Sequence, residues 1–136
     1  MGSAFHLRLA PSTANVAALL DALEAFSERA GIPAAVALRL NLIAEELAAN
    51  VAMHGKGASF FAFALAPAEG GLRLTMEDDG PEFDPLSVAA PDLAAAVEER
   101  EVGGLGLRFL REMTRGAHYE RAGGVNRLVC TLPLGA

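Results

Sequence analysis

An acidic residue and an amide residue lie four positions apart in the sequence, at Glu46 and Asn50. Residues at this spacing on a helix point to the same side. A carboxylate placed there can take a proton from a hydroxyl that attacks phosphorus. An amide oxygen one turn later is a neutral, hard ligand for Mg²⁺, which keeps several waters and shares phosphate oxygens. The pair is compatible with phosphate chemistry, although the same pair also occurs as ordinary exposed helix residues.

A second candidate group follows about 30 residues later, in the run Asp78-Asp79-Gly80. Asp78 stands at the end of a predicted strand, where its carboxylate can accept a hydrogen bond from the exocyclic amine of adenine. Gly80 lets the backbone approach such a base closely. The alternative is a polar turn that ends the strand, because Asp-Gly pairs are common in turns.

The third candidate group is the run Gly103-Gly104-Leu105-Gly106, just before a predicted helix. Unpaired N–H groups at a helix start suit phosphate oxygens. Arg108, Arg111 and Arg115, at spacings of 3 and 4, can add positive potential. The alternatives are that the glycine run is an ordinary loop and that the arginines form a surface exposed to solvent. Taken in their fixed order, however, the three groups together predict a nucleotide site with a magnesium ion.

The bulk composition excludes other classes of protein and site. A chain of 136 residues suits one domain, 1–136, and its one cysteine, Cys130, excludes an internal disulfide framework. The net charge of -6 argues against nucleic acid as the main partner. No apolar run is long enough to span a membrane, so we expect a cytoplasmic protein without membrane contact. Lys56 is the only lysine and no P-loop motif is present, which rules out that kind of nucleotide site.

The periodicity of apolar residues predicts the elements that position these groups. The segment 81–102 contains two prolines and reads as a loop or lid, with a short helical stretch near 93–99. Strand pairs joined by turns favour an α+β fold, in which a mostly antiparallel sheet is covered on one face by helices. The predicted strands are 5–9, 60–66, 72–77, 117–121 and 126–132, and the predicted helices are 12–30, 34–54 and 105–114.

The helix predicted over 34–54 carries its core residues and its candidate site residues on different sides. Glu46 and Asn50 lie on a different side of this helix from its apolar stripe. The helix can therefore pack on the sheet and still present the acid and the amide beside it. The apolar stripe consists of Val36, Leu40, Ile43, Leu47 and Val51.

With these motifs the chain resembles the anti-sigma-factor serine/threonine kinases, the stand-alone branch of the GHKL (Bergerat-fold) ATPases. The resemblance covers nearly the whole chain, from about Phe5 to Leu134. It assigns the catalytic carboxylate and the Mg²⁺-binding amide to the first pair, adenine binding to the Asp-x-Gly turn, and phosphate contacts to the glycine run. The matching residues are Glu46, Asn50, Asp78, Gly80, Gly104 and Gly106.

The resemblance implies a two-layer α/β sandwich of the Bergerat type, with ATP and Mg²⁺ between helices and sheet under the lid. It implies transfer of phosphate to a Ser or Thr of a small STAS-type anti-anti-sigma protein, and sequestration of a sigma factor. This sequence departs from the family pattern at two positions. Glu82 stands where the adenine turn often has a second glycine. Asn126 falls near the place of a Gly-Thr pair that contacts the base, so Asn126 is a candidate adenine contact.

Two alternatives stay open at the level of sequence. The first is a regulatory module that binds ATP and a partner protein but has little kinase activity. The second is a detached histidine-kinase catalytic domain, which would phosphorylate a histidine of its partner. Pairing of two copies through the exposed sheet face is a further expectation by analogy with the family.

Overall fold

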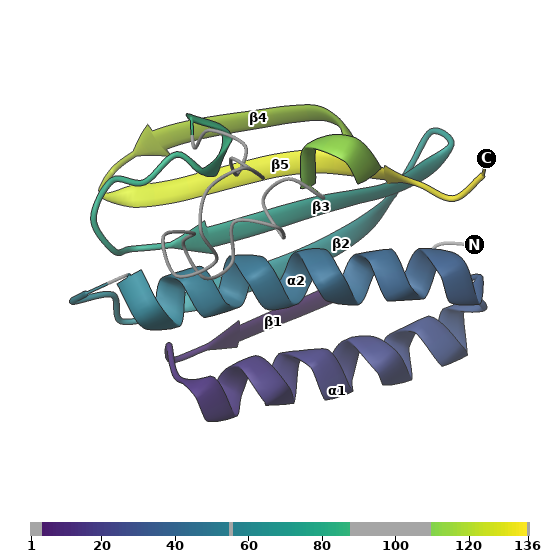
Figure 1. Ribbon diagram of the computed structural model, residues 1–136, viewed down its shortest axis with the longest axis horizontal. Coiled ribbons are helices and arrows are strands. Elements are labelled where there is room, and N and C mark those ends of the chain that lie inside the picture. The colour runs from purple at the N-terminus through teal and green to yellow at the C-terminus, as the bar shows by residue number, and fades with distance from the viewer. Residues whose placement is uncertain (1–3, 55, 88–109, 136) are drawn as a thin grey trace, which may run out of the picture.

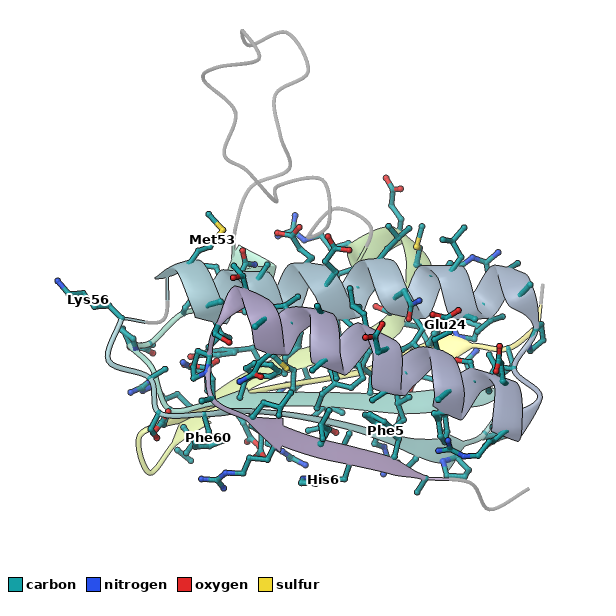
Figure 2. All side chains as sticks on the ribbon, turned by 90° about the horizontal axis from the view of Figure 1, so that it is seen from below. Phe5, His6, Glu24, Met53, Lys56 and Phe60 are labelled. Atoms are coloured by element: carbon teal, nitrogen blue, oxygen red, sulfur yellow. The ribbon has the colours of Figure 1, made fainter. Side chains whose placement is uncertain are left out.

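The computed structural model describes residues 4–54, 56–87 and 110–135. In this part of the chain, five strands form one antiparallel sheet in the order β1-β2-β3-β5-β4. Both long helices lie on the same face of the sheet (Figure 1, Figure 2). The α+β, two-layer prediction is therefore confirmed. The elements are β1 (Phe5–Leu9), α1 (Thr13–Ala30), α2 (Ala34–His54), β2 (Phe61–Ala68), β3 (Gly71–Asp78), the 3₁₀ turn η1 (Pro85–Ser87), β4 (Arg115–Ala122) and β5 (Val125–Pro133).

The ends of α1 follow from its capping residues. The Ser12 side chain accepts a hydrogen bond from the Asn15 backbone N–H at 3.0 Å, which satisfies one of the free donors of the first turn. The helix ends at Gly31, whose φ of 69° is left-handed and favours glycine. The turn at Gly31 leads directly into α2, so the two helices lie side by side on the sheet (Figure 1).

Helix α2 packs on the sheet with the side that the sequence predicted. All five residues of its apolar stripe are buried in the core between helices and sheet. Glu46 and Asn50 are only partly buried, beside this stripe. The helix thus fixes the acid and the amide at the border between the core and the solvent.

Strand β2 is longer than predicted and continues to Ala68. Because β1 pairs only with residues up to Leu65, Pro67 lies where β2 has no described neighbour on that side, and a proline is tolerated there. The turn to β3 is tight, and a Cβ atom on Gly71 would lie 2.3 Å from the Leu132 carbonyl oxygen. Glycine is therefore required at this position for β3 and β5 to pair.

The pairing of β3 with β5 places Asp78 directly opposite Asn126. These two residues are 48 positions apart in the sequence, yet the antiparallel register brings the end of one strand to the start of the other. Residues 110–113, before β4, are helical, and β4 and β5 extend slightly beyond their predicted bounds. The predicted helical stretch 93–99 and the start of the helix 105–114 lie outside the described residues.

The core is continuous from α1 to β5 and includes Cys130, as predicted. Burial raises the pKa of the Cys130 thiol to about 11, so this group stays neutral at physiological pH. Among the helices that the structure describes, none has the combination of length and apolarity that crossing a membrane requires.

Candidate active site

A pocket of about 150 Å³ lies between α2 and the neighbouring ends of β3 and β5. Three residues that the sequence singled out, Asn50, Asp78 and Asn126, all line it. The C-terminal end of α2 and the paired ends of the two strands lie at the same end of the molecule (Figure 1). The other lining residues are Leu47, Val51, Met76, Pro81, Glu82, Phe83, Pro85, Tyr119 and Leu128.

The walls of this pocket are mostly apolar, and its polar groups are few. Leu47 and Val51 come from α2, whereas Met76 and Leu128 come from the sheet. An apolar slot with a small number of placed polar groups is typical of sites for small molecules.

The Asn50 amide is a polar group that the described residues leave partly unsatisfied. Its Nδ2 atom is buried and has no hydrogen-bond partner among the described residues. Buried amides are normally hydrogen-bonded, and rotating this side chain exchanges its nitrogen and oxygen. Asn50 therefore fits a contact to phosphate or to a Mg²⁺ ion. Within the described ranges, no three His, Cys, Asp or Glu residues cluster in a way that could hold a metal ion.

Glu46 lies one turn before Asn50 on α2 and has an unusual acidity. Burial, followed by the neighbouring negative charge of Glu45, raises the pKa of Glu46 from 4.5 to about 7. A carboxylate with this pKa exchanges a proton near neutral pH, which suits a general base. Glu46 is not among the described residues that line the pocket.

The Asp78 carboxylate is oriented by two hydrogen bonds to one of its oxygens. Its Oδ1 atom accepts from the Gly80 backbone N–H at 2.9 Å and from the Asn126 amide at 3.0 Å. Gly80 is itself buried and is not among the described residues that line the pocket. The contacts of Asp78 and Gly80 with adenine remain predictions.

Asp79 is not among the described residues that line this pocket, and no motif in the sequence singled it out. Its Oδ1 accepts from the backbone N–H groups of Ser59 at 2.7 Å and Phe60 at 3.2 Å, and its Oδ2 accepts from the Ser59 hydroxyl. The hydroxyl bond is the main reason why the pKa of Asp79 is lowered. The segment after α2 is thereby tied to the turn that carries Asp78. A second aspartate before Gly80 was the only sequence signal of this link.

Two further residues near the site were also missed, Tyr119 and Arg121. Both donate hydrogen bonds to the Asn126 side chain. Tyr119 and Glu82 line the pocket, so the unusual carboxylate in the adenine turn does face the site. The sequence predicted a strand near these residues, but it could not indicate which of their side chains share a partner.

The glycine run Gly104, Leu105 and Gly106 lies outside the described residues, as does Arg108. Their proposed phosphate contacts therefore stay predictions. Arg111 is described, and it donates a hydrogen bond to the Leu86 carbonyl oxygen. It thus holds η1 to the segment that precedes β4.

Comparison with known proteins agrees with this geometry. Residues 9–132 match the family described as the histidine kinase-like ATPase domain. Serine/threonine-protein kinase BtrW of Bordetella bronchiseptica is 30% identical over 96 residues, which cover 68% of this chain and 67% of that protein. The family match implies ATP binding, and the relative supports a kinase-like activity. The chain therefore belongs to the histidine kinase-like (GHKL) ATPase family and, as its motifs indicated, is similar within it to the anti-sigma-factor serine/threonine kinases.

Proposed function

We propose that this chain is an ATP- and Mg²⁺-dependent protein serine/threonine kinase of the anti-sigma-factor type. The observation that carries the proposal is the meeting of Asn50, Asp78 and Asn126 in one pocket, with Glu46 one turn away on α2. The pKa of Glu46, near 7, supports its role as the base. The kinase named in the comparison supports the reaction type.

Asp78 is the proposed reader of the base. Its carboxylate accepts a hydrogen bond from the exocyclic amine of adenine, while the ring lies between the apolar walls of the pocket. Gly80 keeps the backbone of the turn close to the ring. An acceptor at this point favours adenine over a base that presents a carbonyl oxygen there.

Asn50 is the proposed metal ligand, and Gly104, Leu105 and Gly106 are the proposed contacts to phosphate. Bound Mg²⁺ supplies neutralisation of the charge that develops on the phosphate oxygens. The buried Asn50 nitrogen has no partner among the described residues, and rotating the amide puts its oxygen, the atom that Mg²⁺ binds, in that place.

Glu46 is the proposed general base. It takes the proton of the acceptor hydroxyl as that oxygen forms a bond to the γ-phosphorus of ATP. The bond between this phosphorus and the bridging oxygen breaks, and ADP leaves. The products are a phosphorylated Ser or Thr and a protonated Glu46 carboxyl, which returns its proton to solvent.

The proposed protein substrate is a small STAS-type anti-anti-sigma protein, and the proposed second partner is a sigma factor. These assignments place the chain in the regulation of transcription, in the cytoplasm. They rest on the resemblance of the motifs and on the kinase named in the comparison.

A transfer assay tests the proposal. The protein is incubated with γ-labelled ATP, Mg²⁺ and each STAS-domain protein of its own genome, with Glu46→Ala as the matched control. We expect label on one STAS protein, stable in acid as phosphoserine and phosphothreonine are, and absent with the control. Acid-labile label would instead identify a histidine kinase. ATP binding without any transfer would identify a regulatory module.

A further inference from the structure

Asn126, the second residue of β5, is a polar side chain in the core of the site. It is only 4% exposed, and it lies opposite Asp78 in the strand register. A buried amide is costly unless its donors and its acceptor are all satisfied. The partners of Asn126 therefore indicate what the residue does.

The Asn126 nitrogen faces only acceptors. Nδ2 donates to Asp78 Oδ1 at 3.0 Å and to the Pro81 carbonyl oxygen at 2.8 Å, with the Gly80 carbonyl oxygen further away at 3.5 Å. Two short bonds use both hydrogens of the amide. Asp78 is the last residue of β3, and the other two partners belong to the turn that follows it.

The Asn126 oxygen, in contrast, faces only donors. Oδ1 accepts from the Tyr119 hydroxyl at 2.6 Å, from Arg121 Nη1 at 2.9 Å and from the Phe83 backbone N–H at 3.2 Å. Donors on one side and acceptors on the other allow only one orientation of the amide. The amide has no free donor or acceptor left for a ligand.

Tyr119 and Arg121, which donate hydrogen bonds to Asn126, both remain donors. Burial and the nearby charge of Glu82 raise the pKa of Tyr119, so its hydroxyl stays protonated. The same Arg121 nitrogen also donates to the Gly80 carbonyl oxygen at 2.9 Å. Asn126 is thus held from β4 while it holds the turn and Asp78.

We propose that Asn126 is a positioning residue, which aims the Asp78 carboxylate at the base instead of contacting the base itself. Asn126 and the Gly80 N–H hold Oδ1 of Asp78, which leaves Oδ2 as the oxygen for a ligand amine. Tyr119 and Arg121 hold Asn126 in turn. The inference rests on the proposed function, because it takes Asp78 as the reader of adenine.

The test is a ratio of affinities, measured by calorimetry with Mg²⁺. The two ligands are ATP and purine riboside triphosphate, which lacks the exocyclic amine. We expect the wild type to prefer ATP by about 10-fold or more, the value of a hydrogen bond to a charged group. Asn126→Asp keeps the acceptor side but puts a second carboxylate against Asp78. This variant should lose most of the preference, because ATP affinity falls while affinity for the analogue changes little.

Two further variants make the result decisive. Tyr119→Phe removes one hydrogen bond to Asn126 and should lower the preference for ATP by a smaller factor. If Asn126→Asp does not fold, this variant tests the positioning role in its place. Arg127→Ala, the next residue of β5, breaks ion pairs with Glu77 and Glu120 and should leave the ratio unchanged.

The outcomes separate the two proposals. Equal losses for both ligands, or an unchanged ratio in the folded variants, would overturn the positioning role and leave the kinase proposal standing. A wild type that binds neither ligand would contradict the kinase proposal itself, and the positioning role with it.

Discussion

At the scale of single residues, the account depends first on the acidity of Glu46. A pKa near 7 means that the carboxyl is half ionised at neutral pH. Only the ionised form can accept a proton, so the rate of phosphate transfer should rise with pH through about 7 and level off above it. We expect Glu46→Gln to lower transfer about 100- to 10,000-fold. Equal wild-type rates at pH 6 and pH 8 would contradict the role of Glu46 as base.

The same pKa shift predicts an effect on stability. The folded-state pKa of Glu46 is raised above 4.5, so between pH 4.5 and about 7 the folded protein binds more protons than the unfolded chain. The free energy of unfolding therefore falls as the pH rises through this range. Glu46→Gln removes the penalty, and its gain in Tm should be larger at pH 8 than at pH 5. Glu24→Gln, on the exposed side of α1 (Figure 2), controls for loss of a surface carboxylate.

Asn50 gives the third prediction at this scale. If its amide oxygen binds the metal, Asn50→Ala should remove the gain in ATP affinity that Mg²⁺ gives to the wild type. The loss of metal-dependent affinity should be at least about 10-fold, since even indirect supports of metal ligands cost this much. Calorimetry with Mg²⁺ and with a chelator measures it. Equal tightening by Mg²⁺ in both proteins would show that the ligand is another group.

At the scale of elements, the spacing of apolar residues in the sequence predicted which side of a helix is buried. The apolar stripe of α2 follows from burial on one side of the helix, so its buried residues could be named in advance. The prediction for β2 ended at residue 66, before Pro67, whereas the strand continues to Ala68 because Pro67 lies beyond the pairing with β1. The links of Asp79 to Ser59 and of Tyr119 to Asn126 could not be predicted, since they depend on strand register.

Helix α2 should tolerate changes on its outer face and not on its inner face. Leu40 is fully buried and Leu38 is 62% exposed, only two residues away. Leu40→Ala should cost about 2–5 kcal/mol of unfolding free energy, whereas Leu38→Ala should stay within about 0.5 kcal/mol. Denaturant unfolding of both variants measures the difference. Similar costs would mean that α2 does not pack on the sheet in this orientation.

At the scale of the whole molecule, the site depends on contacts between distant parts of the chain. Asn50 comes from a helix, whereas Asp78 and Asn126 come from paired strands. The sequence named all three residues, because the family motifs mark Asn50 and Asp78 and because Asn126 falls near the place of the family's Gly-Thr pair. It could not show that every donor and acceptor of the Asn126 amide is hydrogen-bonded, because these bonds depend on how β4 and the turn after β3 meet beside Asn126.

A second apolar pocket lies at the opposite end of the β2–β3 hairpin. It is lined by Phe26 and Ile32 from the helical layer, by Gly70 and Leu72 from the hairpin, and by Leu134 near the end of the chain. It shares no described lining residue with the first pocket, and it has no acidic residue or carboxamide in its lining. The two pockets therefore offer a direct choice between two places for a ligand.

The most direct test of the account is a map of amide chemical shifts by NMR, recorded with and without the magnesium complex of a non-hydrolysable ATP analogue. We predict that, within the described part of the chain, the changes concentrate on Asn50, Asp78, Gly80, Phe83 and Asn126, and that Asp78→Asn weakens them. Changes centred on Phe26 and Leu134, or none at saturating ligand, would contradict the claim that α2, β3 and β5 together form the ATP site.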